Sequence, residues 1–194
     1  PQRTKVLAMA MGLGMMLGGS LALLRQFLDQ RLKSVDEVSA MLGLPVLGVI
    51  PAMSRREDRS ARGQITCLQS QSHVAEAYRT VRTAVFFGVP KTEAKTVLIT
   101  SAAPGEGKST MASNLAIAMA QAGQRVLVID ADFRRPALHV FFEAGHHPGL
   151  SDYLSGEMRL EETVIRSRRA NLWFMPTGPL NEDPGGLLNG KRMQ

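Results

Sequence analysis

The sequence predicts an α/β fold built on a parallel β-sheet, with one transmembrane helix in front of it. Three features lead to this prediction: an uncharged apolar run at 6–24, a strand, glycine loop and helix in that order at 95–122, and an entirely apolar run at 126–129. A run of the last kind is typical of a strand buried on both faces of a parallel sheet.

The amino-acid composition limits which cellular compartment and which binding partners are expected. Of the 194 residues only Cys67 is a cysteine, so an internal disulfide is excluded and a reducing compartment is expected. The formal net charge is +6, but aromatic residues make up only 5% of the chain and the basic residues are scattered. Nucleic-acid binding calls for a concentrated basic surface, so we expect no nucleic acid and prefer anionic lipid or phosphate as the partner.

The apolar run at 6–24 is long enough to cross a bilayer. Its 19 residues carry no charge, and a helix rising ~1.5 Å per residue spans roughly 28 Å over that length. A cleaved signal peptide and a buried soluble helix are the alternatives. Gly14 and Gly18 form a GxxxG step that suits packing against another span, or they reflect only how common small residues are in membrane helices. We expect residues 1–33 to form this span and a juxtamembrane helix.

Residues 34–71 are expected to connect the membrane helix to the next domain. Ser34 and Glu37 form a capping box that starts a short helix, which Gly43 can end. The stretch 44–51 is expected to be extended. Residues 54–63 are polar and net basic, which indicates a basic linker, either flexible near the lipid surface or a plain solvated loop.

The domain expected at 72–194 begins with a helix at 73–86, in which apolar side chains recur at helical spacing. Glu76, Arg79 and Arg82 are three residues apart on a neighbouring face of this helix. Such a row can bind a partner, or Glu76 can pair with Arg79 one turn away, which is worth about 0.2–0.5 kcal/mol. The spacing alone favours the local pair.

The segment AAPGEGKST predicts a nucleotide-phosphate loop because it stands between an apolar strand at 95–101 and a helix that begins near Lys108. Its glycines allow backbone N–H groups to turn toward phosphate oxygens. Lys108 is expected to neutralise the β and γ phosphates of ATP, Ser109 to place its hydroxyl on Mg²⁺, and Thr110 to lie beside the α phosphate. The expected nucleotide-binding residues are Gly105, Glu106, Gly107, Lys108, Ser109 and Thr110.

Two further points concern this loop. Ala102 stands where the common GxxxxGK[ST] pattern has its first glycine, and alanine is small enough to keep the turn. The helix after the loop is expected to end at Gly123. Because ATP is available in the cytoplasm, the loop predicts that the chain after the membrane span lies inside the cell.

Two acids follow the apolar strand at 126–129. Ligands of doubly wound sheets bind beyond the carboxyl ends of the strands, so Asp130 and Asp132 are expected beside the phosphate loop. Their oxygens suit Mg²⁺, and either carboxylate can instead take a proton from an attacking hydroxyl. Capping of the following turn is the alternative interpretation.

The rest of the chain carries weaker signals. His139, His146 and His147 lie near Pro and Gly residues, so a loop is expected there rather than a metal site. Residues 171–176 are expected to form another strand, followed by a turn and a helix at 184–188.

Four segments together resemble the bacterial tyrosine kinases that are joined to a polysaccharide co-polymerase, or chain-length determinant, membrane region. They are the glycine-bearing span with LLRQFLDQRLKS and LGLPVLGVIP, then EAYRTVR, SAAPGEGKST and VLVIDADFRRP. The resemblance covers nearly the whole chain. The related septum-placement and plasmid-partition ATPases carry a lysine where this chain has Ala103, which favours the kinases.

The resemblance assigns roles to residues. The family's ExxRxxR oligomerisation motif matches Glu76, Arg79 and Arg82, which replaces the local-pair interpretation with subunit contact. Its DxDxR pattern matches Asp130, Asp132 and Arg134. Within this pattern the two acids are implied to serve Mg²⁺ and phosphoryl transfer, so Lys108, Asp130 and Asp132 become the expected catalytic residues and Ser109, Asp130 and Asp132 the expected Mg²⁺ ligands.

The implied function is ATP-dependent autophosphorylation on tyrosine between subunits of a homo-oligomeric ring in the inner (plasma) membrane. Its implied role is to control polymerisation and export of exopolysaccharide or capsular polysaccharide, with that machinery as partner. The resemblance places the Walker B strand after residue 176, so the domain at 72–194 is expected to be truncated before it and to be inactive alone. The alternatives are a membrane-bound P-loop ATPase switch and a chain-length determinant without kinase activity.

Overall fold

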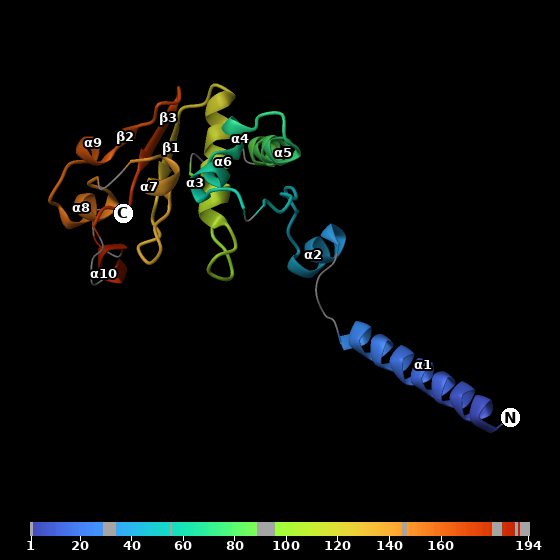
Figure 1. Ribbon diagram of the computed structural model, residues 1–194. Helices are drawn as coiled ribbons and strands as arrows, with labels where there is room; N and C mark the ends of the chain where they lie inside the picture. The colour runs from blue at the N-terminus through green and yellow to red at the C-terminus, as the bar shows by residue number, and fades with distance from the viewer. Residues whose placement is uncertain are drawn as a thin grey trace. The chain divides into compact units, whose positions relative to one another are not determined.

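The structure is a computed structural model with two compact units, Pro1–Val46 and Leu47–Gln194 (Figure 1). It describes residues 2–28, 34–54, 56–88, 96–144, 147–179, 184–188 and 190. The second unit holds the predicted phosphate loop and both predicted acids. Its boundary at Leu47 precedes the domain start expected at residue 72.

The described part of the first unit contains two helices, and short sequence features predict both of them. Helix α1 (Gln2–Leu28) contains an 18-residue window with a mean hydropathy of 1.9 and has no buried residue, so its length and composition suit a membrane span. Of the predicted juxtamembrane continuation, 25–28 is helical and 29–33 lies outside the described residues. Helix α2 (Val35–Leu42) begins where the Ser34 hydroxyl accepts a hydrogen bond from the Glu37 backbone N–H and ends at Gly43, whose φ is +64°, as the caps predict.

The sheet of the second unit is mixed. Strands β1 (Val126–Ile129) and β3 (Leu172–Met175) pair in parallel, and β2 (Ile165–Arg166) pairs antiparallel with β3, giving the order β1-β3-β2. The parallel pairing of β1 with β3 confirms the predicted α/β architecture. Strand β2 was not predicted, because two residues are too few to show a periodicity.

The strand expected at 95–101 is not formed, and this prediction was wrong. Within the described part, 96–101, the backbone makes no strand pairing, and the Leu98 side chain is 87% exposed. A cavity of about 550 Å³ separates this segment from the open side of β1. The apolar, β-branched sequence favours an extended backbone, but a strand also requires a neighbour that pairs with it.

Helices pack beside the sheet and against one another (Figure 1). They are α3 (Arg59–Gly63), α4 (Ile65–Leu68), α5 (His73–Gly88), α6 (Lys108–Gln121), α7 (Leu138–Phe141), α8 (Leu150–Ser155), α9 (Leu160–Thr163) and α10 (Pro184–Leu188). The helices predicted at 73–86, after Lys108 and at 184–188 are confirmed as α5, α6 and α10. The main core lies between one sheet face and helices α6 and α7, where Val128, Leu172 and Phe174 pack with Ile117 and Phe141.

Part of the predicted basic linker belongs to the compact unit. Residues 59–63 form α3, and a Cβ atom on Gly63 would lie 2.3 Å from the Phe141 ring, so the helix requires glycine to pack this closely. Helix α6 holds the segment through buried polar groups: the Ser113 hydroxyl donates to the Gly63 carbonyl, and Asn114 bonds the backbone of Arg62 and Thr66. These satisfied buried polar groups fix the segment at a single position on α6.

Candidate nucleotide and phosphoryl-transfer site

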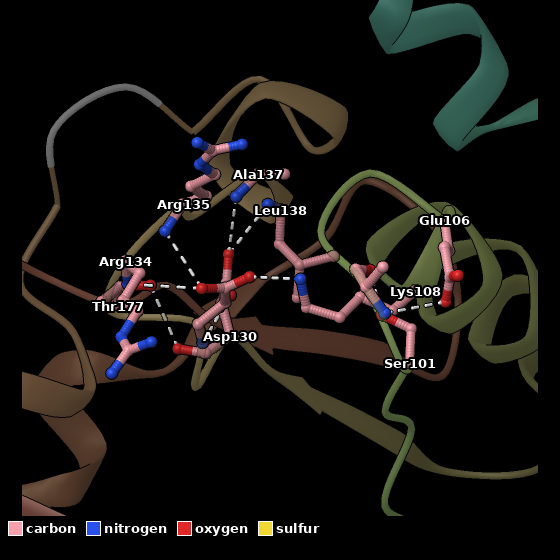
Figure 2. A network of polar contacts seen from close by, with 11 residues as sticks. Ser101, Glu106, Lys108, Asp130, Arg134, Arg135, Ala137, Leu138 and Thr177 are labelled. Atoms are coloured by element: carbon pink, nitrogen blue, oxygen red, sulfur yellow. Dashed lines mark hydrogen bonds and ion pairs between the residues drawn. The ribbon is translucent and has the colours of Figure 1, made fainter. Parts of the chain in front are cut away.

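The phosphate loop is exposed and is shaped by its own polar contacts. Gly105 and Gly107 have φ values of +86° and +92°, a conformation that residues with a Cβ rarely adopt. The Glu106 carboxylate accepts a hydrogen bond from the Ala103 N–H at 3.1 Å, and the Ser101 hydroxyl donates to the Ala103 carbonyl at 2.9 Å (Figure 2). Helix α6 begins directly after the loop, so the positive end of its dipole faces the loop.

Lys108 and Asp132 meet in an ion pair. The Lys108 Nζ lies 2.5 Å from Asp132 Oδ2, and the two side chains are 30% and 17% exposed. The other oxygen, Oδ1, accepts hydrogen bonds from the backbone N–H groups of Arg134 at 3.3 Å and Arg135 at 3.0 Å. The structure therefore brings Asp132 to the phosphate loop and also shows it capping its own turn, so both interpretations of this residue are realised in one geometry.

Asp130 occupies a different environment. It is only 4% exposed, and its Oδ2 accepts hydrogen bonds from the N–H groups of Ala137 at 2.9 Å and Leu138 at 3.0 Å, at the start of α7. Its Oδ1 accepts a third from the N–H of Asp132 at 3.2 Å. The capping interpretation is thus realised at Asp130, whose side chain holds together both ends of the loop that carries Asp132 (Figure 2). Its expected roles as a Mg²⁺ ligand and a catalytic residue stay predictions.

Thr177 completes the network, and sequence reasoning missed it. Its hydroxyl donates to the Asp130 carbonyl at 3.1 Å from a position only 2% exposed. It follows β3 as Asp130 follows β1, and the parallel pairing of these strands brings the two residues to the same sheet edge. A polar residue shortly after a buried strand was the available signal.

The pKa of Asp132 is lowered from 3.8, chiefly by the Lys108 hydrogen bond, and further by the backbone N–H groups of Arg135 and Arg134 and the lysine charge. Because the folded-state pKa lies below the unfolded value, this contribution to stability is full above pH ~4 and is lost as the pH falls through the lowered pKa. In Lys108→Met we expect the Asp132 carboxyl to titrate at a higher pH than in wild type. The ¹³C chemical shift of that carboxyl measures it, and an unchanged midpoint would contradict the assignment.

The donors in the site suit magnesium. Ser109, in the first turn of α6, and Asp132 offer a hydroxyl and a carboxylate, which are the hard oxygen ligands that Mg²⁺ prefers. Within the described ranges no group of three or more His, Cys, Asp or Glu side chains gathers as a metal site. Magnesium in phosphoryl-transfer sites uses few protein ligands because substrate phosphates and water supply the others.

The histidine prediction is partly wrong. His139 lies in the single turn of helix α7, not in a loop, because Asp130 caps the N-terminus of that turn. His147 lies in a loop as expected, and His146 lies outside the described residues.

The predicted row on α5 makes contacts within its own chain. Arg79 pairs with Glu76 at 2.7 Å and donates to the Ser70 carbonyl at 2.7 Å, and Arg82 donates to the Ala118 carbonyl of α6 at 3.2 Å. The local pair that spacing favours is therefore present. The Glu76 side chain remains 67% exposed, and the row's role in subunit contact stays a prediction.

Known proteins share this arrangement. Residues 97–172 match the family model described as the CobQ/CobB/MinD/ParA nucleotide binding domain. The tyrosine-protein kinase YwqD of Bacillus subtilis (strain 168) is 40% identical over 145 residues, which are 73% of this chain and 61% of YwqD. The solved structure of the BceF tyrosine kinase domain is 31% identical, superposes with a TM-score of 0.76, and aligns with 84% of this chain and 69% of that domain. The chain belongs to the bacterial tyrosine kinases.

The site residues described above lie within the part of the chain that matches this family. The nucleotide-binding family model covers the phosphate loop, Asp130 and Asp132, and it begins after helix α5. The succinoglycan biosynthesis transport protein ExoP of Rhizobium meliloti (strain 1021) is 28% identical over 203 residues, which are 92% of this chain and 26% of ExoP. The chain therefore spans about three fifths of YwqD and about a quarter of ExoP.

Proposed function

We propose that the whole protein is an ATP-dependent tyrosine autokinase that regulates polymerisation and export of an exopolysaccharide or capsular polysaccharide. The observation that carries this proposal is the contact of Lys108 with Asp132 at the end of the phosphate loop. This contact brings the Lys108 ammonium group, which neutralises phosphate, beside the Asp132 carboxylate, which can bind Mg²⁺ or accept a proton. The tyrosine kinase names of YwqD and BceF support the choice of acceptor.

Transfer of the γ-phosphoryl group breaks the bond between the γ phosphorus and its bridging oxygen and forms a bond to the tyrosine oxygen, whose proton must leave. Lys108 neutralises the phosphate charge, and the loop N–H groups orient the phosphates. Ser109 and Asp132 would hold Mg²⁺, which neutralises charge on the phosphate oxygens when bound. Asp132 serves that ion or takes the tyrosine proton, whereas Asp130, whose oxygens already accept three backbone hydrogen bonds, positions Asp132.

The acceptor tyrosines are proposed to lie outside this nucleotide site, on neighbouring subunits. The sequence contains two tyrosines, Tyr78 and Tyr153. Tyr78 is 2% exposed, and burial raises its pKa to about 12 despite a hydrogen bond with Asn114. Tyr153 is half-buried against the small core cluster around Phe133 and Leu150. Both rings belong to the packing of the domain, which does not suit a phosphate acceptor.

Subunit contact is proposed to run through the exposed part of α5. Replacing Glu76, Arg79 and Arg82 together with alanine is expected to shift the full-length protein in detergent from a ring-sized oligomer to smaller species, as measured by mass photometry. Thr80→Ala on the same helix, also exposed, is the matched control and should leave the mass unchanged. An unchanged oligomer mass in the triple variant would reject subunit contact through these residues and leave them a role only within their own chain.

The open side of β1 suggests where the fold continues. The 550 Å³ cavity is lined along the whole of β1, from Gln124 to Asp132, and by Val97 and Leu98 on its opposite side. We propose that the Walker B strand implied by the family resemblance pairs there, between β1 and the segment at 96–101. Its aspartate would then reach the same sheet edge as Asp132.

The membrane location is likewise proposed. Helix α1 has the length and hydropathy of a span, and ExoP is named as a transport protein of succinoglycan biosynthesis. Together these support a position in the inner membrane with the nucleotide site in the cytoplasm.

A second candidate is an ATPase switch that hydrolyses ATP without phosphorylating protein. The match to the CobQ/CobB/MinD/ParA model favours it, because that model describes nucleotide binding and not a kinase. Incubating the full-length protein with γ-labelled ATP and Mg²⁺ separates the two functions. Label on tyrosine in acid-hydrolysed protein supports the autokinase, and released phosphate without labelled tyrosine rejects it in favour of the switch.

A further inference from the structure

The first turn of helix α6, residues 108–111, carries groups that are expected to bind phosphate, and we call it the phosphate-binding turn. The first hydrogen bond of the helix runs from the Met111 N–H to the Gly107 carbonyl at 2.8 Å. The N–H groups of residues 108–110 precede this bond, so they have no partner within the helix and are available to phosphate oxygens. The position of this turn therefore decides how well phosphate binds.

Asn114 lies one helical turn further along α6 and is 0% exposed. Its Nδ2 group donates to the Thr110 carbonyl, inside the phosphate-binding turn, at 3.0 Å and to the Arg62 carbonyl of α3 at 2.8 Å. Its Oδ1 accepts a hydrogen bond from the Thr66 N–H of α4 at 2.9 Å. One amide side chain thus ties the phosphate-binding turn to two neighbouring helices.

A fourth contact of Asn114 reaches helix α5. The Tyr78 hydroxyl is hydrogen-bonded to the Asn114 side chain, and Tyr78 is 2% exposed. Asparagine has two N–H donors and one oxygen with two lone pairs, so four partners use its full hydrogen-bonding capacity. A buried polar side chain whose hydrogen bonds are all made holds its partners in one arrangement.

We propose that Asn114 is a positioning residue of the nucleotide site, which fixes the phosphate-binding turn of α6 against α3, α4 and α5. Because Asn114 is fully buried, it acts on phosphate through Thr110 and not by direct contact. All four of its contacts lie within the unit Leu47–Gln194. This inference rests on the nucleotide binding of the proposed function, and it holds for the autokinase and for the ATPase switch alike.

Ser113 provides a matched control because it is the neighbouring residue of α6 and is also 0% exposed. Its hydroxyl donates to the Gly63 carbonyl at 2.6 Å, so it helps to hold the same α3 segment on α6. Among the described residues, this hydroxyl makes no hydrogen bond to the phosphate-binding turn. If Asn114 served only to hold α3, replacing either residue would have the same effect on phosphate affinity.

The test compares Asn114→Ala with Ser113→Ala in the full-length protein in detergent. The melting temperature of each variant is measured first, and all titrations are made well below the lowest of them. Binding of a fluorescent, non-hydrolysable ATP analogue with Mg²⁺ gives one dissociation constant, and its displacement by inorganic tripolyphosphate gives a second. Tripolyphosphate has no base or sugar, so it reports on the phosphate-binding groups alone.

Asn114→Ala is expected to raise both dissociation constants by the same factor, about 10-fold, which is the lower end of the usual cost of losing a supporting hydrogen-bond partner at a metal-containing site. Ser113→Ala is expected to lower the melting temperature but to leave both constants at their wild-type values. Unchanged constants in Asn114→Ala overturn the proposal. An equal rise in Ser113→Ala also overturns it, because the effect would then belong to the contact with α3. A rise for the ATP analogue alone would place the effect at the base or sugar and contradict the proposal as well.

If Asn114→Ala does not fold, Tyr78→Phe tests the same arrangement from α5. It keeps the aromatic ring and removes only the hydroxyl that contacts Asn114. Both dissociation constants are expected to rise by a common but smaller factor, because Asn114 keeps its bonds to Arg62, Thr66 and Thr110. Wild-type constants in folded Tyr78→Phe would overturn the proposal. Absence of binding by the wild-type protein, in contrast, would reject the nucleotide site and with it the proposed function.

Discussion

Replacing Lys108 with methionine is expected to lower tyrosine phosphorylation by the full-length kinase about 10²–10³-fold, the usual cost of losing one preorganised group that stabilises transition-state charge. The physical reason is specific to this site. We expect Lys108 to leave its ion pair with Asp132 when phosphate binds, and no other lysine lies among the described residues that line the cavity. Methionine keeps the length and apolar stem of the side chain, so the loss isolates the charge.

Two measurements accompany this variant. Binding of a fluorescent ATP analogue is expected to weaken in parallel, whereas the melting temperature should change little, because partly exposed ion pairs contribute about 0–1 kcal/mol. Full phosphorylation by Lys108→Met would place phosphoryl transfer at another site and reject the mechanism proposed above. A large fall in melting temperature would instead make the loss of activity a folding effect.

Asp130→Asn is expected to destabilise the nucleotide domain by about 2 kcal/mol, which for a domain of this size lowers the melting temperature by roughly 4–8 °C. An asparagine has one acceptor oxygen, so its NH₂ group must face at least one of the backbone N–H donors of Asp132, Ala137 and Leu138. A donor left unpaired in a site that is only 4% exposed carries the full cost of its desolvation. Thermal unfolding followed by circular dichroism measures this effect.

Asp132→Asn is the matched control, since it makes the same chemical change two residues away. Its side chain is more exposed, at 17%, and its partners are a lysine that is 30% exposed and two N–H groups of an exposed turn. We expect a stability change below about 1 kcal/mol together with a loss of phosphorylation of about 10²-fold. If Asp130→Asn leaves stability unchanged while Asp132→Asn lowers it, the positioning and reacting roles have been assigned the wrong way round.

Local signals in the sequence were sufficient for several elements. The caps at Ser34 and Gly43 fix α2, the glycines of the phosphate loop fix its left-handed turns, and the apolar run at 126–129 forms a strand as predicted. Each of these features depends on residues within a few positions of one another. For that reason no knowledge of the rest of the chain was needed.

Features that depend on distant partners were missed or misjudged. The segment at 96–101 has the composition of a strand but no pairing neighbour, and the two-residue β2 exists only because β3 lies beside it. The basic segment at 59–63 was expected to be a linker because its own residues are polar. Buried contacts from Ser113 and Asn114, about fifty residues away, hold it in the domain.

By itself, the sequence determined the class of this protein: a membrane-type helix, a phosphate loop and two acids after a buried strand, in the order that the bacterial tyrosine kinases share. Only the tertiary structure decided how the two acids differ. Both follow β1 and both are aspartates, so nothing local separates them. The burial of Asp130 under α7 and the approach of Lys108 to Asp132 come from packing between β1, α6 and α7, which puts one carboxylate among backbone N–H groups and the other beside a lysine.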